Sequence, residues 1–336
     1  MGISLAFMGG FRIFHLGHKA VIDKALELAD EVVVVIGSQY APRSPKVPFT
    51  ANERRDFIRA VYPNEPRLKI TTVPDFPYSD EDWIASVETA VESIAIPGND
   101  IGLIGHSKDQ SSYYLNIFPK WGTHVEVENV AGINATDIRQ MLYRKEPSAW
   151  ADFVPEQTVS LVEAIISNHP QEWQNVLDWN DDLLKTKSAW SVSPYPPIFT
   201  TVDVCAIHAG CVLLIERGGP QGRGLWALPG GFLEQHEVAR AGALREFYEE
   251  VVIHGVSVSI GEPHVFDRPD RSERGRTISI AYPIKIIRYP RKGLPMIQAA
   301  ESDAARAFWQ PVNQLPPSNF FEDHASIIEH FINKPG

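Results

Sequence analysis

The first half of this 336-residue chain alternates apolar, β-branched runs with segments of helical period. The clearest run spans residues 31–36, and a helical pattern at about 16–29 precedes it. Buried strands separated by amphipathic helices are typical of βαβ units, which place parallel strands in one sheet. We therefore predict a doubly wound α/β domain, a fold that binds ligands at the carboxyl ends of its strands. Strands are expected at 3–8, 31–36, 69–73, 101–104 and 124–130, and helices at 51–61 and 82–94.

The pattern changes past the middle of the chain. A helical stretch at 155–184 is followed by Ser, Pro and aromatic residues without a period at 188–197. Beyond them we expect a hairpin around 208–210, then a glycine-rich loop that leads into a helix at about 238–252. The sequence thus predicts a first domain over 1–185, a linker over 186–199 and an α+β domain over 200–336.

The net charge of the chain limits the classes of partner that it is expected to bind. The chain has 31 Lys and Arg against 42 Asp and Glu, a formal net charge of −11. Affinity for nucleic acid comes from clustered Lys and Arg, so nucleic acid is not expected as a partner. The longest apolar runs are far shorter than the ~18 residues of a membrane span, and no signal-peptide pattern opens the chain. We expect no membrane partner and a cytoplasmic location.

The loop after the first predicted strand carries His15-Leu-Gly-His18 at the start of a helix. A helix N-terminus offers free N–H groups and the positive end of a dipole, so two imidazoles there can join in binding a polyphosphate. The alternative is that the histidines only cap the helix or are partly buried. A second segment, residues 132–139, again follows a strand and opens a helix. There Thr136 can cap the helix and Arg139 can point toward the same phosphates.

These two motifs resemble those of the nucleotidyltransferase superfamily. Residues 37–38, 48–54 and 105–114, together with Trp83, resemble more narrowly the archaeal-type nicotinamide mononucleotide (NMN) adenylyltransferases. The resemblance implies a Rossmann-like domain that transfers AMP from ATP to NMN, giving NAD and pyrophosphate, with magnesium bridging the phosphates. It implies His15, His18 and Arg139 as catalytic residues, and Phe11, Lys46, Trp83, Gly105 and Thr136 as substrate-binding ones.

Within that resemblance the roles differ. His15 and His18 would bind the ATP phosphates, Lys46 and Arg139 would steady the leaving pyrophosphate, and Trp83 would stack on the nicotinamide ring. Trp83 as a plain core residue and Lys46 as a solvated loop charge stay open. One position departs from the family pattern, which has arginine after the first glycine of the loop: here that residue is Gly10, and the nearest arginine is Arg12.

The second half carries a set of carboxylates at regular spacing. Glu246, Glu249 and Glu250 fall at i, i+3 and i+4, so they share one face of a helix. Hard oxygen donors suit Mg²⁺, with Mn²⁺ as a second choice, and such an ion activates water and neutralises a diphosphate. Arg245 can hold the carboxylates in orientation. The alternative is a solvated acidic helix.

The spacing from the glycine-rich loop to these glutamates resembles the Nudix box, in which every charged position matches. The resemblance implies hydrolysis of a nucleoside diphosphate linked to another group. It implies Glu237, Glu246, Glu249 and Glu250 as metal ligands, Glu249 and Glu250 as catalytic residues, and Gly231 in substrate binding. Val252 stands where the box has a glycine that serves the turn after the helix.

Weaker features bear on the substrate. Pro269 and the arginine-rich stretch 267–277 resemble the substrate loop of ADP-ribose hydrolases, which implies that Arg268 and Arg271 bind substrate. Pro269 can equally be a turn former. Glu301 and Asp303 are candidates for the general base that takes a proton from the attacking water, and either can equally be a solvated loop acid.

Together the two halves resemble bifunctional NMN adenylyltransferase/Nudix ADP-ribose pyrophosphatases of bacteria. The resemblance implies ATP, NMN and ADP-ribose as ligands and leaves a homo-oligomer open. Two alternatives remain. The first is a Nudix hydrolase whose N-terminal domain only binds nucleotide. The second is a regulator that senses ADP-ribose; that class carries a winged DNA-binding domain after the Nudix domain, whereas only a short helical segment at 324–333 is expected here.

Overall fold

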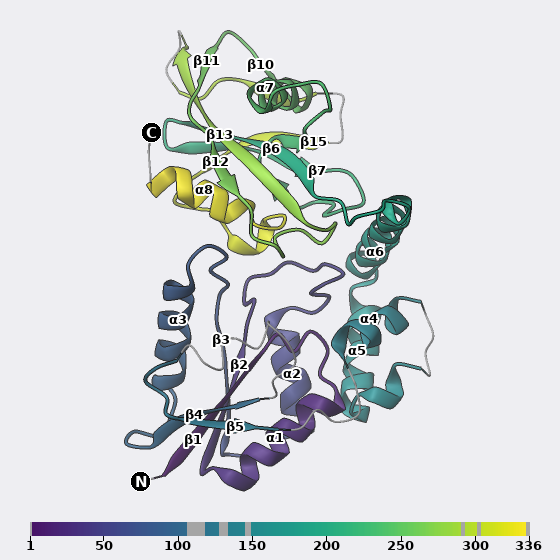
Figure 1. Ribbon diagram of the computed structural model, residues 1–336, viewed down its shortest axis with the longest axis vertical. Helices are drawn as coiled ribbons and strands as arrows, with labels where there is room; N and C mark the ends of the chain where they lie inside the picture. The colour runs from purple at the N-terminus through teal and green to yellow at the C-terminus, as the bar shows by residue number, and fades with distance from the viewer. Residues whose placement is uncertain are drawn as a thin grey trace. The chain divides into compact units, whose positions relative to one another are not determined.

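The computed structural model describes residues 2–105, 118–127, 134–144, 149–289, 293–300 and 304–333 (Figure 1). The chain divides into two compact units, Met1–Val176 and Leu177–Gly336. The predicted pairing of a doubly wound α/β domain with an α+β domain is confirmed by the strand topology of the two units.

The first unit contains a parallel sheet with the strand order β3-β2-β1-β4-β5. Its strands are β1 (Ile3–Gly9), β2 (Glu31–Ile36), β3 (Leu68–Thr72), β4 (Asp100–Gly105) and β5 (Thr123–Glu126). Its helices are α1 (Leu16–Leu28), α2 (Ala51–Val61), α3 (Asp80–Glu92), α4 (Ala135–Tyr143), the short η2 (Ala151–Phe153), α5 (Glu156–Asn168) and the first part of α6 (Pro170–Trp190).

The strand order decides where this unit can bind a ligand. The chain leaves β1 toward β2 and β3 on one side, and later returns to place β4 and β5 on the other. Such a reversal opens a crevice at the carboxyl ends of the two central strands. Here those ends are Gly9 and Gly105, so the loop 10–15 between β1 and α1 lies at the switch point.

The second unit is built on a mixed sheet, in which β6 pairs parallel with β13 and antiparallel with β7. A two-residue turn with positive φ at Ala209 and Gly210 joins β6 to β7, as predicted. The strands are β6 (Phe199–His208), β7 (Cys211–Arg217), β8 (Trp226–Ala227), β9 (Gly230–Phe232), β10 (Val251–Ile253), β11 (Ser257–Ile260), β12 (His264–Phe266), β13 (Thr277–Arg288), β14 (Ile297–Ala299) and β15 (Ala304–Pro311). The helices are α7 (Ala239–Glu250), the short η3 (Pro317–Asn319) and α8 (His324–Asn333).

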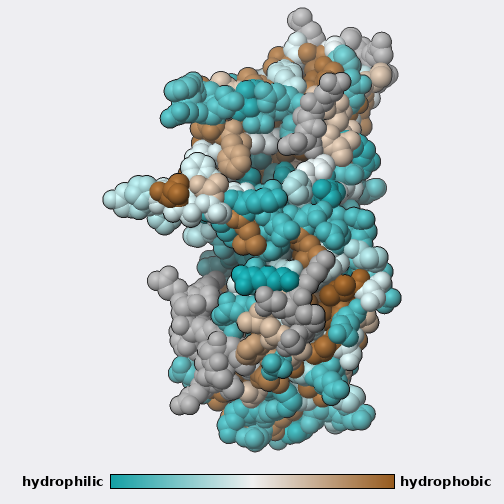
Figure 2. All heavy atoms as spheres, turned by 90° about the vertical axis from the view of Figure 1, so that its right-hand side faces the viewer, coloured by the Kyte–Doolittle hydropathy of each residue, from teal (hydrophilic) through white to brown (hydrophobic). Residues whose placement is uncertain are grey.

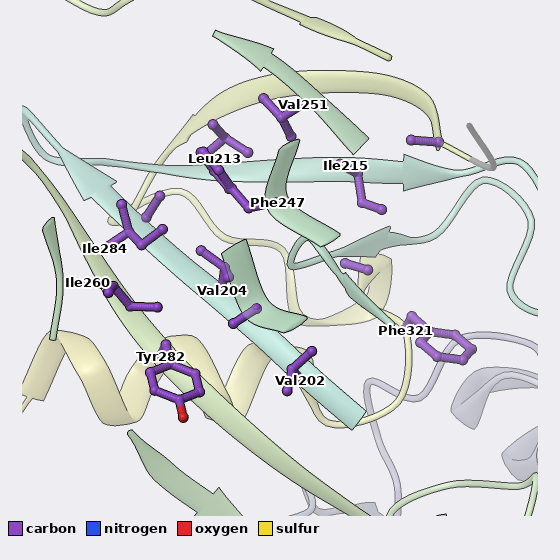
Figure 3. Close-up of a cluster of buried hydrophobic side chains, with 14 of the residues drawn as sticks. Val202, Val204, Leu213, Ile215, Phe247, Val251, Ile260, Tyr282, Ile284 and Phe321 are labelled. Atoms are coloured by element: carbon purple, nitrogen blue, oxygen red, sulfur yellow. The ribbon is translucent and has the colours of Figure 1, made fainter. Parts of the chain in front are cut away.

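Side chains alternate across this sheet and hold a helix on each face. Val202 and Val204 of β6 pack in one cluster with Phe247 of α7 (Figure 3). Cys205, from the opposite face of the same strand, packs in a second cluster with Ile327 of α8. Because successive strand residues point to opposite faces, one strand can support both helices. Helix α7, which carries three of the four predicted metal ligands, is thereby fixed on the sheet.

Helix α6 contributes to both units. Trp173, near its start, stacks on Phe49 of the first unit, whereas Trp179 and Leu183 belong to the core of the second. The compact units therefore divide inside the helix, at Val176/Leu177, and the helix continues to Trp190. The linker at 186–199 stays a prediction.

The described helices carry no membrane-length apolar segment. None of them is long and apolar enough to cross a bilayer. On the face drawn in Figure 2 hydrophilic side chains cover most of the coloured surface, and hydrophobic ones form small patches. Scattered apolar patches of this kind are ordinary on a protein surface.

Candidate active sites

The histidine pair of the first motif opens α1. His15 is the N-cap residue, and its Nδ1 accepts a hydrogen bond from the backbone N–H of His18 at 3.4 Å. In return the Nδ1 of His18 accepts from the N–H of His15, also at 3.4 Å. The two imidazoles stack with centroids 3.7 Å apart. A side chain at Gly17 would lie about 3.0 Å from the His15 ring, which explains the glycine between them. The motif therefore caps the helix and brings both rings together at the switch point.

Arg54 joins two loops at the same place. Its side chain is fully buried, and Nη1 donates to the carbonyl oxygens of Gly10 at 2.7 Å and Gly37 at 2.8 Å. Nη2 donates to the carbonyl oxygen of Ser38 at 2.7 Å. These carbonyls follow β1 and β2, so a single guanidinium fixes the loops after two neighbouring strands. The sequence analysis assigned no role to Arg54, although it lies in the segment 48–54 that resembles the adenylyltransferases. Its position four residues after Thr50, which caps the helix, could have indicated that its side chain lies near the start of that helix.

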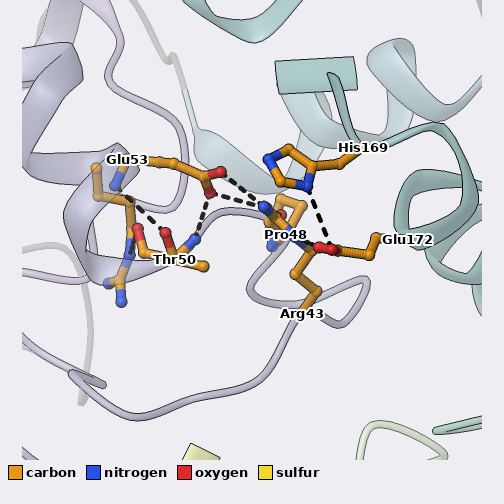
Figure 4. A network of polar contacts seen from close by, with 7 residues as sticks. Arg43, Pro48, Thr50, Glu53, His169 and Glu172 are labelled. Carbon is orange, nitrogen blue, oxygen red and sulfur yellow. Dashed lines mark hydrogen bonds and ion pairs between the residues drawn. The ribbon is translucent and has the colours of Figure 1, made fainter. Parts of the chain in front are cut away.

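The loop that carries Lys46 is held from two sides. Arg43 makes a two-pronged ion pair with Glu53 of α2, at 2.6 and 2.8 Å, and a second ion pair with Glu172 at 2.7 Å (Figure 4). Burial alone would raise the pKa of Glu53, but the hydrogen bonds from Arg43 and Thr50 lower it below its usual value. A half-buried pair with these geometries orders the loop.

The other side of that loop is tied to α4. The hydroxyl of Tyr143 donates to the carbonyl oxygen of Pro45 at 2.7 Å, next to the half-buried Lys46. The same helix carries Arg139, whose Nη2 donates to the hydroxyl of Thr136 at 3.3 Å. The contact between Tyr143 and Pro45 therefore joins the Lys46 loop to the helix that carries Arg139.

The cap of α4 differs from the prediction. Asn134, and not Thr136, is the N-cap residue, because its side chain accepts from the N–H of Asp137 at 2.9 Å. Thr136 is already inside the helix, where its hydroxyl accepts from Arg139. The expected capping role of Thr136 is wrong.

The remaining candidates of the first unit lie around this sheet. Phe11 is only 1% exposed, and its ring packs 5.2 Å from Phe7 and 4.8 Å from His18, so it supports the histidines from the core. Half-buried Trp83 of α3 packs on Phe118, with ring centroids 5.8 Å apart. Gly105 ends β4 beside the switch point. Residues 106–114 and 132–133 of the quoted motifs lie outside the described residues.

In the second unit Arg245 gathers three of the four predicted metal ligands. Its Nη1 donates to Glu246 at 2.9 Å and to Glu249 at 2.8 Å, and its Nη2 donates to Glu237 at 2.7 Å. The hydrogen bond from Arg245 to Glu237 lowers the pKa of Glu237 below its usual value. These contacts are the ones that Arg245 needs in order to hold the carboxylates in orientation. Among the residues that the structure describes, no three His, Cys, Asp or Glu side chains form a metal-binding group.

Two glycines bring the glycine-rich loop against the carboxylates. A Cβ at Gly231 would lie 2.5 Å from Glu246 Oε1, so only glycine leaves the carboxylate its place. The N–H of Gly230 donates to Glu250 Oε2 at 2.9 Å. Burial raises the pKa of Glu250 to about 8 despite this hydrogen bond, and it also raises the pKa of Glu246. A nearby divalent cation would favour the charged state of these two half-buried carboxyls.

The arginine-rich stretch divides into different environments. Arg268 lies in a loop and pairs with Asp270 at 2.7 Å. Arg271 is buried and makes two hydrogen bonds to Asp323, at 2.7 and 2.8 Å, so its guanidinium is held within the fold. The small polar cavity beside the glycine-rich loop is lined also by Arg274 and Arg217. Sequence reasoning named neither arginine as a site residue.

The general-base candidates Glu301 and Asp303 lie outside the described residues. They stay predictions. Strand β14, which ends at Ala299, and β15, which starts at Ala304, border them.

Both units match known protein families. The cytidylyltransferase-like family matches residues 6–96, and the NUDIX domain family matches residues 197–331. A nicotinamide/nicotinic acid mononucleotide adenylyltransferase of Acinetobacter baylyi is 37% identical over 161 residues, which cover 47% of this chain and 84% of the relative. A crystal structure of a bifunctional NMN adenylyltransferase/ADP-ribose pyrophosphatase from Francisella tularensis is 30% identical, with a TM-score of 0.88 over 100% of both chains.

This chain belongs to the family of bifunctional NMN adenylyltransferase/ADP-ribose pyrophosphatases. The Francisella protein has also been solved with AMP and a manganese ion, in a structure that is 29% identical to this chain with a TM-score of 0.88. A nicotinamide-nucleotide adenylyltransferase of Sulfurisphaera tokodaii is 30% identical over 165 residues, covering 47% of this chain and 90% of the relative. The similarity therefore extends over both units, the one that contains His15 and His18 and the one that contains α7.

Proposed function

We propose that the chain has two activities, each in its own unit. The first unit transfers AMP from ATP to NMN, releasing pyrophosphate and forming NAD. The second hydrolyses ADP-ribose to AMP and ribose 5-phosphate. The observation that carries this proposal is the full-length similarity to a protein named for both activities, with a TM-score of 0.88 over both units.

In the first site the protein positions and neutralises charge. A phosphate oxygen of NMN attacks the α-phosphorus of ATP, the bond to the bridging oxygen breaks, and pyrophosphate leaves. This chemistry needs no protein nucleophile. His15 and His18, stacked at the N-terminus of α1, bind the polyphosphate, and the helix dipole adds to their attraction. Arg139 and Lys46 stabilise the negative charge of the leaving group, and Trp83 stacks on the nicotinamide ring.

In the second site a water molecule attacks the diphosphate, and the bond between a phosphorus and the bridging oxygen breaks. Glu246, Glu249, Glu250 and Glu237 would hold a divalent cation, magnesium or manganese, which would lower the pKa of the water and offset the charge of the substrate. The hydrogen bonds of Arg245 orient three of these carboxylates, those of Glu237, Glu246 and Glu249, before substrate binds. Either Glu301 or Asp303 takes the proton of the attacking water.

A pair of variants tests both assignments. With magnesium present, Glu249→Gln is expected to lower AMP formation from ADP-ribose by about a hundredfold or more, since it removes a carboxylate from the ion, and to leave NAD formation unchanged. His18→Ala is expected to do the reverse. Glu262→Gln, at an exposed position of the second unit, serves as the control.

The outcomes separate the alternatives. If each variant abolished both reactions, the two-site assignment would fail. If the wild-type chain formed AMP from ADP-ribose but no NAD from ATP and NMN, the first unit would be a nucleotide-binding module beside a hydrolase.

A further inference from the structure

Arg12 lies over Gly10 in the loop between β1 and α1. A Cβ built on Gly10 would meet Arg12 Nε at 3.2 Å, Cγ at 3.4 Å and Cδ at 3.7 Å. The residue between them, Phe11, has a φ of +43°, a left-handed conformation that turns the chain back on itself. The side chain of Arg12 therefore packs directly against the position that the Cβ of a residue-10 side chain would take.

A second guanidinium group, that of Arg54, lies close to Arg12. Arg54 donates to the carbonyl oxygen of Gly10, so two guanidinium groups meet at the same residue. Burial, and then the charge of Arg12, lower the pKa of Arg54 to about 10. The carboxylates of Asp75 and Glu53 offset the charge of Arg54 in part. The N-terminus of α1, which begins at Leu16, adds the positive end of a helix dipole.

Two guanidinium groups that lie close together repel each other, and an anion bound beside them reduces that repulsion. The structure places Arg12 and Arg54 at the switch point of the sheet, where a doubly wound fold binds its ligand. A polyphosphate is an anion of this kind, and guanidinium groups bind phosphate oxygens in pairs.

We infer that Arg12 is a phosphate-binding residue of the first site, with its guanidinium placed over Gly10 to contact the polyphosphate of ATP. This inference rests on the proposed adenylyl transfer. Arg54 does not contact the nucleotide; it positions the backbone over which Arg12 lies.

Single variants test the charge. Arg12→Gln is expected to lower kcat/KM for ATP in NAD formation by about 30- to 100-fold, as the loss of a charge-assisted phosphate contact does, and Arg12→Lys by less. Inhibition by added pyrophosphate should weaken in parallel, because pyrophosphate occupies the same contact. Hydrolysis of ADP-ribose by the second unit should not change, which reports that the variant is folded.

A double variant that moves the arginine from position 12 to position 10 tests where the guanidinium must lie. Because a side chain at position 10 would start beside the side chain of Arg12, Gly10→Arg combined with Arg12→Gln should return kcat/KM for ATP to within a few-fold of the wild-type value. Wild-type kinetics and wild-type pyrophosphate inhibition in Arg12→Gln would overturn the inference, and so would a double variant as impaired as Arg12→Gln.

The two proposals fail in different ways. If the wild-type chain formed no NAD, the proposed transfer would fail, and calorimetric titration of pyrophosphate into wild-type and Arg12→Gln protein would still decide the role of Arg12. Equal affinity in the two proteins would overturn it, and weaker binding by the variant would support it.

Discussion

Arg54 is a charged side chain whose hydrogen bonds replace those of water inside the first unit. It donates to carbonyl oxygens of Gly10, Gly37 and Ser38, and no part of it is exposed. Ser38 has a φ of +52°, so the loop after β2 holds a conformation that a non-glycine residue adopts at a cost. The guanidinium compensates for that cost by binding the carbonyls on both sides.

Replacing Arg54 should therefore affect stability and activity together. Arg54→Met leaves buried carbonyl groups without donors, and we expect it to lower the free energy of unfolding of the first unit by about 2–4 kcal/mol. NAD formation should fall with it, while ADP-ribose hydrolysis remains. Urea unfolding and both assays measure this, with Arg59→Met on the exposed face of the same helix as control. Equal stability of the two variants would contradict the bridging role.

Because His324 is buried, we expect the stability of the second unit to fall in acid. Its Nδ1 accepts a hydrogen bond from the N–H of Leu228 at 3.0 Å, and burial lowers its pKa from 6.5 to about 3. The folded chain therefore keeps the imidazole neutral while the unfolded chain takes up a proton below pH 6.5. Stability is complete above pH 6.5 and falls by up to about 1.4 kcal/mol per pH unit as the pH drops toward 3.

A glutamine at position 324 can accept the same hydrogen bond without titrating. We expect His324→Gln to reduce the fall in the free energy of unfolding between pH 6.5 and 5, as measured by urea denaturation. His254→Gln, at an exposed position, should keep the wild-type dependence. An unchanged slope in His324→Gln would show that other groups cause the loss.

Among the elements, the junction of α7 and β10 explains why the Nudix box tolerates Val252. The helix ends at Glu250, and Val251 is already extended, with φ −130° and ψ 117°. Val252 then pairs with Gln298 of β14. The chain turns later, at Gly255, where φ is +68°. The expected turn directly after the helix is absent here, so the position needs a strand-forming residue in place of glycine.

Restoring the usual glycine should thus be harmful. Val252→Gly is expected to lower stability by about 1 kcal/mol, because glycine is entropically costly in a strand and buries no side chain. Hydrolysis of ADP-ribose should not increase. Thermal unfolding and the AMP assay check this, with Val252→Thr, which keeps the β-branch, as comparison. A more stable glycine variant would contradict the pairing.

At the scale of the whole molecule, the two units have separate cores although one helix contributes to both. Leu183 of α6 is 4% exposed in the core of the second unit, whereas its neighbour Leu184 is 45% exposed. This contrast allows the units to be destabilised one at a time.

Leu183→Ala should lower the stability of the second unit by about 2–5 kcal/mol, the usual effect of emptying a buried leucine site. The temperature at which hydrolysis is lost should fall, and the temperature at which NAD formation is lost should not. Leu184→Ala should leave both unchanged. If Leu183→Ala lowered both temperatures equally, the units would unfold as one.

Local patterns in the sequence determined much of this protein. The alternation of runs and helical periods predicted the parallel sheet. The spacing of His15 and His18 predicted two imidazoles at the start of a helix, where they stack, and the spacing of Glu246 and Glu249 predicted carboxylates on one face of a helix, where both accept from Arg245. These signals are readable because strand and helix periods relate residues only a few positions apart. The family resemblance, now supported over both units, rests on the same short motifs.

Contacts between distant residues were decided only by the tertiary structure. Arg54 reaches a carbonyl 44 positions away, and Arg271 pairs with Asp323 at a separation of 52. No period connects such positions, so the sequence could not tell which arginines of 268–276 are held inside the fold. The contact of Arg12 with Gly10 is short in sequence but depends on the left-handed conformation of Phe11, whose buried ring packs against Phe7 and His18.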